Sequence, residues 1–216
     1  MAARRVKDPR PVVLALPRGG VPVGFVVAGC FQGEVEFDVF LVRKLGVPNH
    51  EELAFGAIAS GGVRVLNRQV IEDVGLSDDD VARVTERERL ELERREHLYR
   101  EGRPPIELRD RVVILVDDGL ATGATMIAAV RAARRQEPKR VVVAVPVASR
   151  QAAAELAEAA DEVICARIPD QFHAVGYWYR DFEQVTDDEV RELLDLFRQM
   201  RNRRASTPHI VLQTDD

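Results

Sequence analysis

The chain has 216 residues, of which 46% are hydrophobic, and its 31 lysines and arginines against 36 aspartates and glutamates give a net charge of −5. This composition is typical of a folded domain, argues against a disordered chain, and makes nucleic acid an unfavourable partner. No apolar stretch approaches the ~18 residues of a membrane span and the start lacks the apolar core of a signal peptide, so we expect a cytoplasmic protein with no membrane partner.

Apolar β-branched runs alternate with helical stretches along the chain. The runs that we expect to be strands are Pro11–Leu16, Val35–Val42, Arg111–Asp117, Arg140–Val147 and Asp161–Ala166. They are continuously apolar rather than alternating, which is typical of parallel strands covered on both faces. Helices between them, the first over Val21–Phe31, supply the crossovers. The sequence therefore predicts an α/β fold, doubly wound, with a mainly parallel five-stranded sheet flanked by helices.

The segment of about residues 45–105 is too long for a simple crossover and predicts an insertion. Leu53–Ser60 and Val63–Leu66 flank a Gly-Gly pair, a pattern that indicates a β-hairpin. Ser77 then caps a long charged helix that runs to about Arg100 and begins with three aspartates. Opposite charges four residues apart support this helix, and we interpret its charges as a solvated face.

The C-terminal part predicts one more helix and then a tail. Thr186 to Glu189 have the pattern of a capping box, which begins a last helix. From about Arg201 the chain is polar, and we expect residues 201–216 to be disordered. Residues 11–200 are therefore predicted to form a single domain.

The two cysteines predict no special chemistry. Cys30 and Cys165 have neither the density of a disulfide framework nor the spacing of metal ligands. Each lies in an apolar stretch, so we expect two ordinary buried thiols.

The strongest chemical signal is the run VVILVDDGLATGATM over Val112–Met126. An apolar strand delivers two adjacent carboxylates, Asp117 and Asp118, at its carboxyl end, where open parallel sheets bind ligands. The small residues that follow begin a helix and offer backbone amides, two hydroxyls and no bulk, which are the features of a phosphate cradle. The residues of this cradle are Ala121, Thr122, Gly123, Ala124 and Thr125.

Two carboxylates beside a cradle for one phosphate suit a phosphorylated sugar as the ligand. The acids would bind the sugar hydroxyls and the cradle would bind the phosphate. The lysine of a Walker-type loop is absent, so the run does not predict a nucleoside triphosphatase. The alternative interpretation is a tight β–α turn in which Thr122 caps the helix.

This run resembles the signature of the type I phosphoribosyltransferases. The resemblance implies that Asp117 and Asp118 hold the ribose hydroxyls of phosphoribosyl pyrophosphate (PRPP) and that the cradle holds its 5′-phosphate. It spans about Pro11 to Met200 and is closest to a bacterial group with LPRGG, VRK and VDDGxATG blocks.

Two basic segments match this family's pyrophosphate contacts. LPRGG, over Leu16 to Gly20, is similar to the pyrophosphate loop, in which Gly19 and Gly20 let backbone amides approach an anion and Arg18 binds it in a bidentate manner. Arg43 and Lys44 end the predicted second strand, where the family places a basic pyrophosphate contact. The alternatives are a generic turn and an exposed charged strand end.

A third match, over about residues 167–185, resembles the hood that covers the base in purine-salvage members. The resemblance implies that Phe172 stacks on the base, that the main chain of Val175 reads its edge, and that Asp181 helps to hold magnesium. The alternative is that the aromatic residues of this segment are ordinary core or rim residues.

The resemblance implies a Mg²⁺-dependent enzyme of nucleotide salvage. It would transfer the phosphoribosyl group from PRPP to a nitrogenous acceptor, a nucleobase, and release pyrophosphate. The residues implied as catalytic are Arg18, Lys44, Asp117 and Asp118, and those implied as metal ligands are Asp117, Asp118 and Asp181. The other function classes that the residues leave open are a regulatory, PRPP-sensing protein on the same fold and a sugar-phosphate hydrolase. A homodimer is the expected assembly.

One departure from the family bears on the acceptor. Hypoxanthine–guanine enzymes place an aspartate three residues after the second acid, as a base for the purine ring nitrogen, and this chain has Ala121 there. Adenine and uracil enzymes of the family also have alanine at this position. We therefore expect guanine and hypoxanthine to be poor acceptors.

Overall fold

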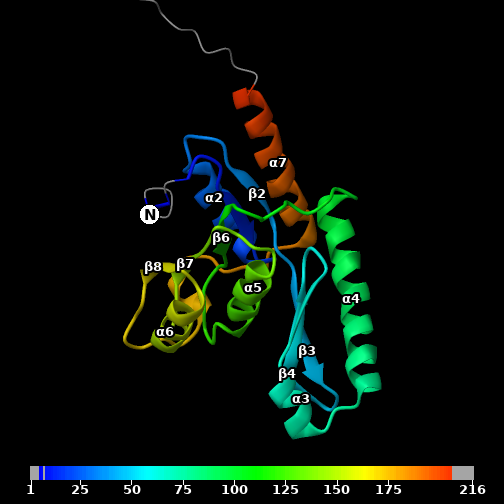
Figure 1. The fold of residues 1–216 in the computed structure, drawn as a ribbon. Helices are drawn as coiled ribbons and strands as arrows, with labels where there is room; N and C mark the ends of the chain where they lie inside the picture. Colours follow the sequence, from blue (N-terminus) through cyan, green and yellow to red (C-terminus); the bar gives the residue numbers. More distant parts are fainter. Residues whose placement is uncertain (1–4, 7, 206–216) are drawn as a thin grey trace, which may run out of the picture.

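The structure is a computed structural model that describes residues 5, 6 and 8–205, and it has two sheets (Figure 1). The larger sheet has five parallel strands in the order β2-β1-β6-β7-β8. Its strands are β1 (Val12–Ala15), β2 (Glu36–Val39), β6 (Val112–Val116), β7 (Arg140–Val147) and β8 (Glu162–Arg167). The predicted five-stranded parallel sheet is confirmed.

Helices cover both faces of this sheet, as its continuously apolar strands predict. Consecutive residues of β6 point to opposite faces of the sheet, so Ile114 packs into one core and Leu115 into the other. One core packs against α2 (Gly20–Gly29) and α7 (Asp187–Ala205), and the other packs against α5 (Ala124–Arg134) and α6 (Arg150–Ala159). The fold is therefore doubly wound.

The smaller sheet is antiparallel and contains the predicted hairpin. Its strands are β3 (Val42–Val47), β4 (His50–Ala59) and β5 (Val63–Leu66). Gly61 and Gly62 join the last two strands with φ angles of 82° and 73°, values that favour glycine. The short helix α3 (Arg68–Val74) and the long helix α4 (Asp78–Arg100) follow. The third strand, β3, was not expected from the sequence.

The predicted strand Val35–Val42 is wrong at its end, because β2 stops at Val39. The Phe40 amide still donates to the Ala15 carbonyl of β1 at 2.8 Å, but from Leu41 on the backbone bonds outside the large sheet. The Arg100 guanidinium donates to the carbonyl of Val39 at 2.8 Å, and Leu41 and Ser60 exchange two hydrogen bonds. Arg43 and Lys44 therefore lie inside β3, the first strand of the small sheet, and do not end a strand of the large sheet.

The long helix α4 begins and ends as predicted, with the Ser77 hydroxyl accepting from the Asp80 amide. The expectation that its charges form a solvated face is wrong for two of them. Arg100 is buried and bonds to Asp38 of β2 at 2.7 Å, and Glu88 is buried and pairs with Arg43. These two ion pairs fasten α4 to the region where the chain passes from one sheet to the other.

Two further expectations need correction. The prediction of a disordered tail is wrong for residues 201–205, which belong to the last helix, α7. The rest of that predicted tail, residues 206–216, lies outside the described residues. Cys30 is exposed because it follows the last turn of α2, and Cys165 is only partly buried because β8 is an edge strand. Across the described residues, no helix combines the length and apolarity that a bilayer crossing requires.

Candidate active site

The acid pair lies at the carboxyl end of the large sheet. Val112–Val116 are all buried, and Asp117 and Asp118 follow directly. The Leu16 amide donates to the Val116 carbonyl at 2.8 Å, so β1 and β6 stay paired to their ends. The loops after these two neighbouring strands therefore begin side by side.

Burial and mutual repulsion set the protonation of the acid pair. Burial, followed by the charge of Asp118, raises the pKa of Asp117 to about 8, and burial also raises the pKa of Asp118. The backbone amide of Asp118 donates to Asp117 Oδ1 at 2.9 Å. In the unliganded protein the pair thus retains a proton near neutral pH, and a cation or a developing positive charge nearby would favour its release.

The loop after β1 approaches the acid pair so closely that only glycine fits. A Cβ added to Gly19 would lie 2.0 Å from Asp118 Oδ2, and one added to Gly20 would lie 2.8 Å from the Val116 carbonyl oxygen. The peptide bond between Pro17 and Arg18 is cis. Gly20 begins α2, so this loop brings a guanidinium and the amides of a helix N-terminus to the acids.

Arg18 has a carboxylate neighbour that sequence reasoning missed. Its Nη1 lies 3.8 Å from Oδ1 of Asp187, the first residue of α7. The buried Tyr99 of α4 donates its hydroxyl to the same oxygen at 2.5 Å, and burial raises the pKa of this tyrosine. Because these contacts join residues 88 or more positions apart, no local sequence pattern indicates them.

The predicted phosphate cradle forms the N-terminus of α5. Gly123 caps this helix with a φ angle of 73° and has no side chain to offer, and the Thr122 hydroxyl lies 3.5 Å from the Ala124 amide. The Ser149 hydroxyl holds the loop by donating to the Ala121 carbonyl at 2.7 Å. Thr125 lines a small hollow with Pro17 and Arg43, which brings the cradle next to the loop after β1.

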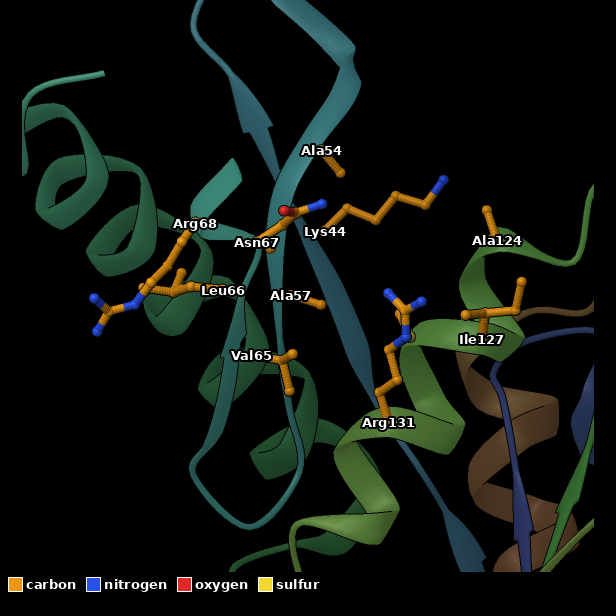
Figure 2. A pocket seen from close by; sticks show the side chains of 12 residues that line it. Lys44, Ala54, Ala57, Val65, Leu66, Asn67, Arg68, Ala124, Ile127 and Arg131 are labelled. Atoms are coloured by element: carbon orange, nitrogen blue, oxygen red, sulfur yellow. The ribbon is translucent and has the colours of Figure 1, made fainter. Parts of the chain in front are cut away.

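Arg43 and Lys44 have different surroundings although they are adjacent. Arg43 donates from Nε and Nη2 to one oxygen of Glu88, at 2.8 and 2.6 Å. Lys44 extends toward α5 and lines a hollow of ≈ 650 Å³ with Ala124 (Figure 2). The structure therefore brings Lys44 to the cradle side of the site, whereas Arg43 is held by α4.

The predicted hood faces the acid pair through residues other than Phe172. A hollow of ≈ 460 Å³ is lined by Arg18, Gly19, Pro22, Val23, Asp118, Tyr179, Asp181, Phe182, Glu183, Gln184 and Val185. The Tyr179 hydroxyl donates to the Asp118 carbonyl at 2.6 Å. Burial and the two carboxylates raise the pKa of Tyr179 to about 12.

Of the predicted hood residues, Asp181 lines this hollow, whereas Val175 and Phe172 do not. Val175 packs against Gly119, where an added Cβ would lie 2.7 Å from Val175 Cγ1. Phe172 is partly buried and does not line the hollow over the acids. The rings of Tyr179 and Phe182 instead lie with their centroids 5.1 Å apart beside Asp118. The run of aromatic residues from Tyr177 to Phe182 is the sequence signal that could have indicated this.

Residues of this site lie within a segment that matches a known protein family. The profile described as the phosphoribosyl transferase domain matches residues 48–180, more than half of the chain. The chain belongs to the phosphoribosyl transferase domain family. The matched residues include the acid pair, the cradle and most of the hood, whereas the loop at Arg18 precedes them.

Similar proteins support the same family. In two strains of Mycobacterium tuberculosis, proteins named "Putative phosphoribosyl transferase" are 49% identical over 184 residues, which is 85% of this chain and 41% of each relative. This chain thus spans about two fifths of the length of those relatives. TT1426 from Thermus thermophilus, a crystal structure, is 45% identical with a TM-score of 0.77 over 87% of this chain and 88% of that one.

Proposed function

We propose that the protein transfers the 5-phosphoribosyl group from PRPP to a nitrogenous acceptor, a nucleobase, and releases pyrophosphate. The observation that carries this proposal is the meeting of three elements at one sheet edge: the acid pair, the glycine loop with Arg18, and the N-terminus of α5. Family membership supports transfer from PRPP. The proposal covers residues 11–200 as one functional unit.

Each element has one task in the proposed reaction. The amides and hydroxyls of Thr122–Thr125 bind the 5′-phosphate, where the helix dipole favours an anion. Asp117 and Asp118 bind the ribose hydroxyls. Arg18, with the amides of Gly19 and Gly20, binds the pyrophosphate.

Departure of pyrophosphate builds positive charge on the ribose C1 and ring oxygen. The protein's contribution is then positioning and electrostatics. The raised pKa of Asp117 means that its full negative charge develops when positive charge is near, which stabilises the cationic ribose. Lys44 stabilises the leaving anion from the cradle side, and Arg43, tied to Glu88, helps to fix the strand that carries Lys44. In this proposal the hairpin region of about Pro48–Gly62 closes as a lid that excludes water.

The acids fit magnesium only as an ion that arrives with the substrate. The described residues contain no group of three or more aspartate, glutamate, histidine or cysteine side chains arranged to hold a metal. Mg²⁺ suits such a site, because it binds through one or two carboxylates plus substrate phosphates. Of the three predicted ligands Asp117, Asp118 and Asp181, the last two line one hollow. These two would hold the ion together with the substrate phosphates, where it would neutralise charge on the pyrophosphate.

The acceptor lies under Tyr179 and Phe182 in this proposal. Guanine and hypoxanthine should be poor acceptors, because a 6-oxopurine must lose a ring proton and Ala121 cannot take it. β7 also offers no lysine to meet a purine 6-oxo group. A fixed general base is typically worth ~10²–10⁴-fold in rate, so its absence is measurable.

Incubation with PRPP, Mg²⁺ and a panel of guanine, hypoxanthine, adenine, uracil and orotate, with pyrophosphate as the readout, tests the proposal. Pyrophosphate release that depends on one base supports the transferase. Tight PRPP binding with no release for any base would favour the PRPP-sensing alternative. Efficient turnover of guanine or hypoxanthine would refute the argument from Ala121.

A further inference from the structure

A second large hollow lies between the small sheet and α5, away from the acid pair (Figure 2). Its volume is ≈ 650 Å³, within the ~300–1,000 Å³ range of small-molecule sites. Arg18, Asp118 and the hood residues do not line it, and they line the ≈ 460 Å³ hollow instead. The two hollows are thus different spaces, although Lys44 and Ala124 belong to the candidate active site as well.

Three cations line this hollow, and in Figure 2 two of them, Lys44 and Arg131, extend into the space between the small sheet and α5, whereas Arg68 points away from them. Figure 2 shows the Lys44 ammonium reaching from β3 and the Arg131 guanidinium reaching from α5. Among the residues that the structure describes, no carboxylate lines the hollow, and neither Lys44 nor Arg131 forms an ion pair with a described residue. Arg134, one turn along α5, pairs with Asp161 at 3.0 Å. In a chain of net charge −5, two uncompensated cations on one hollow form a local site for an anion.

Apart from Asn67 and Arg68, the rest of the wall is apolar. On α5, Ala124, Ile127, Ala128 and Arg131 are spaced three or four residues apart and so share one helix face. The small sheet contributes Val65 and Leu66 opposite them. This helix face thus presents small and aliphatic side chains, followed by the guanidinium of Arg131.

We propose that this hollow binds a phosphorylated ligand with a flat apolar body, with the phosphate between Lys44 and Arg131. Two cations match the charge of a phosphate monoester, and a guanidinium can bind two of its oxygens at once. The apolar wall buries the body of the ligand. An occupant of this hollow engages Lys44, which the proposed reaction uses for pyrophosphate, so binding here is coupled to the transferase through that one side chain.

A titration with 1-naphthyl phosphate tests this assignment. The probe carries a phosphate monoester on a flat apolar ring, and its fluorescence reports binding without PRPP. Arg131→Gln should weaken binding by at least ~10-fold, the loss of one charge-assisted contact. Arg131→Lys, which keeps the charge but not the fork, should bind with intermediate affinity. Arg135→Gln, an exposed arginine of the same helix end that does not line the hollow, is the matched control and should bind as the wild type does.

Three results would overturn the assignment. They are no binding of the probe by the wild type, wild-type affinity in Arg131→Gln, and equal affinity for uncharged 1-naphthol, which would mean that the hollow is only apolar. Thermal unfolding of each variant confirms that it folds. Because no PRPP is present, failure of this experiment is distinct from failure of the proposed transferase, which pyrophosphate release measures.

Discussion

Replacing Asp117 with asparagine should make the unliganded protein more stable while it removes activity. Burial and the neighbouring Asp118 raise the pKa of Asp117 from 3.8 to about 8, so the folded protein binds this proton more tightly than the unfolded chain does. The free energy of unfolding therefore falls as the pH rises from about 4 to about 8. The substituted asparagine would keep the oxygen that accepts from the Asp118 amide but would carry no charge.

The size of the effect follows from the pKa difference. One pKa unit corresponds to about 1.4 kcal/mol, and we take one unit as the lower bound because Asp118 shares the titration. Asp117→Asn should then gain at least ~1.4 kcal/mol at about pH 9, which is ~3–6 °C in the unfolding midpoint of a chain of this size. The gain should nearly vanish below about pH 4, where the wild-type carboxyl is protonated in both states.

Thermal unfolding of wild type and variant across this pH range is the assay. Taking the difference between the two proteins cancels the titrating groups that do not interact with Asp117 and leaves the contribution of the acid pair. Glu189→Gln is the opposite control, because hydrogen bonds from Thr186 lower the pKa of Glu189 and its charge stabilises the folded state at neutral pH. A variant that is less stable than wild type at high pH, or a difference that does not grow with pH, would refute the reasoning about Asp117.

Three further predictions follow from single contacts. Gly19→Ala places a Cβ 2.0 Å from Asp118 Oδ2, so the loop must move and steady-state turnover should fall by ~10²-fold, while unchanged turnover would show that the loop is not part of the site. Arg100→Met leaves a buried acid unpaired and should cost about 3–5 kcal/mol in urea denaturation; a loss below about 1 kcal/mol would show that water compensates the acid. Tyr179→Phe removes the hydrogen bond to the Asp118 carbonyl and should lower the free energy of unfolding by ~1 kcal/mol, and an equally stable variant would contradict the value of this bond.

The large sheet could be predicted because the pattern that indicates each of its strands lies within that strand's own sequence. Each parallel strand is a short continuous apolar run, and both of its faces are buried in the structure, as at Val112–Val116. The end of β2 could not be predicted, because Arg100 and Ser60, which bind the backbone there, are distant in sequence. The apolar run simply continues through that point, so Arg43 and Lys44 were expected at a strand end and lie within β3.

The candidate site likewise has parts that short sequence motifs predict and parts that only contacts between distant residues create. The acid pair, the glycine loop and the cradle are contiguous motifs, and the structure brings them to one sheet edge. Asp187 contacts both Tyr99 and Arg18, which lie far from it in the sequence, and no pattern along the chain relates the three residues. The hollow with Arg131 likewise needs the small sheet opposite α5, which only the folded chain provides.

A crystal structure of the protein with PRPP and Mg²⁺ would show whether the acid pair, the glycine loop and the cradle bind one substrate. We expect the 5′-phosphate on the amides of Thr122–Thr125, the ribose hydroxyls on Asp117 and Asp118, and the pyrophosphate against Arg18 and the glycine loop. A structure with PRPP bound elsewhere, and with these three elements free of ligand, would contradict this expectation.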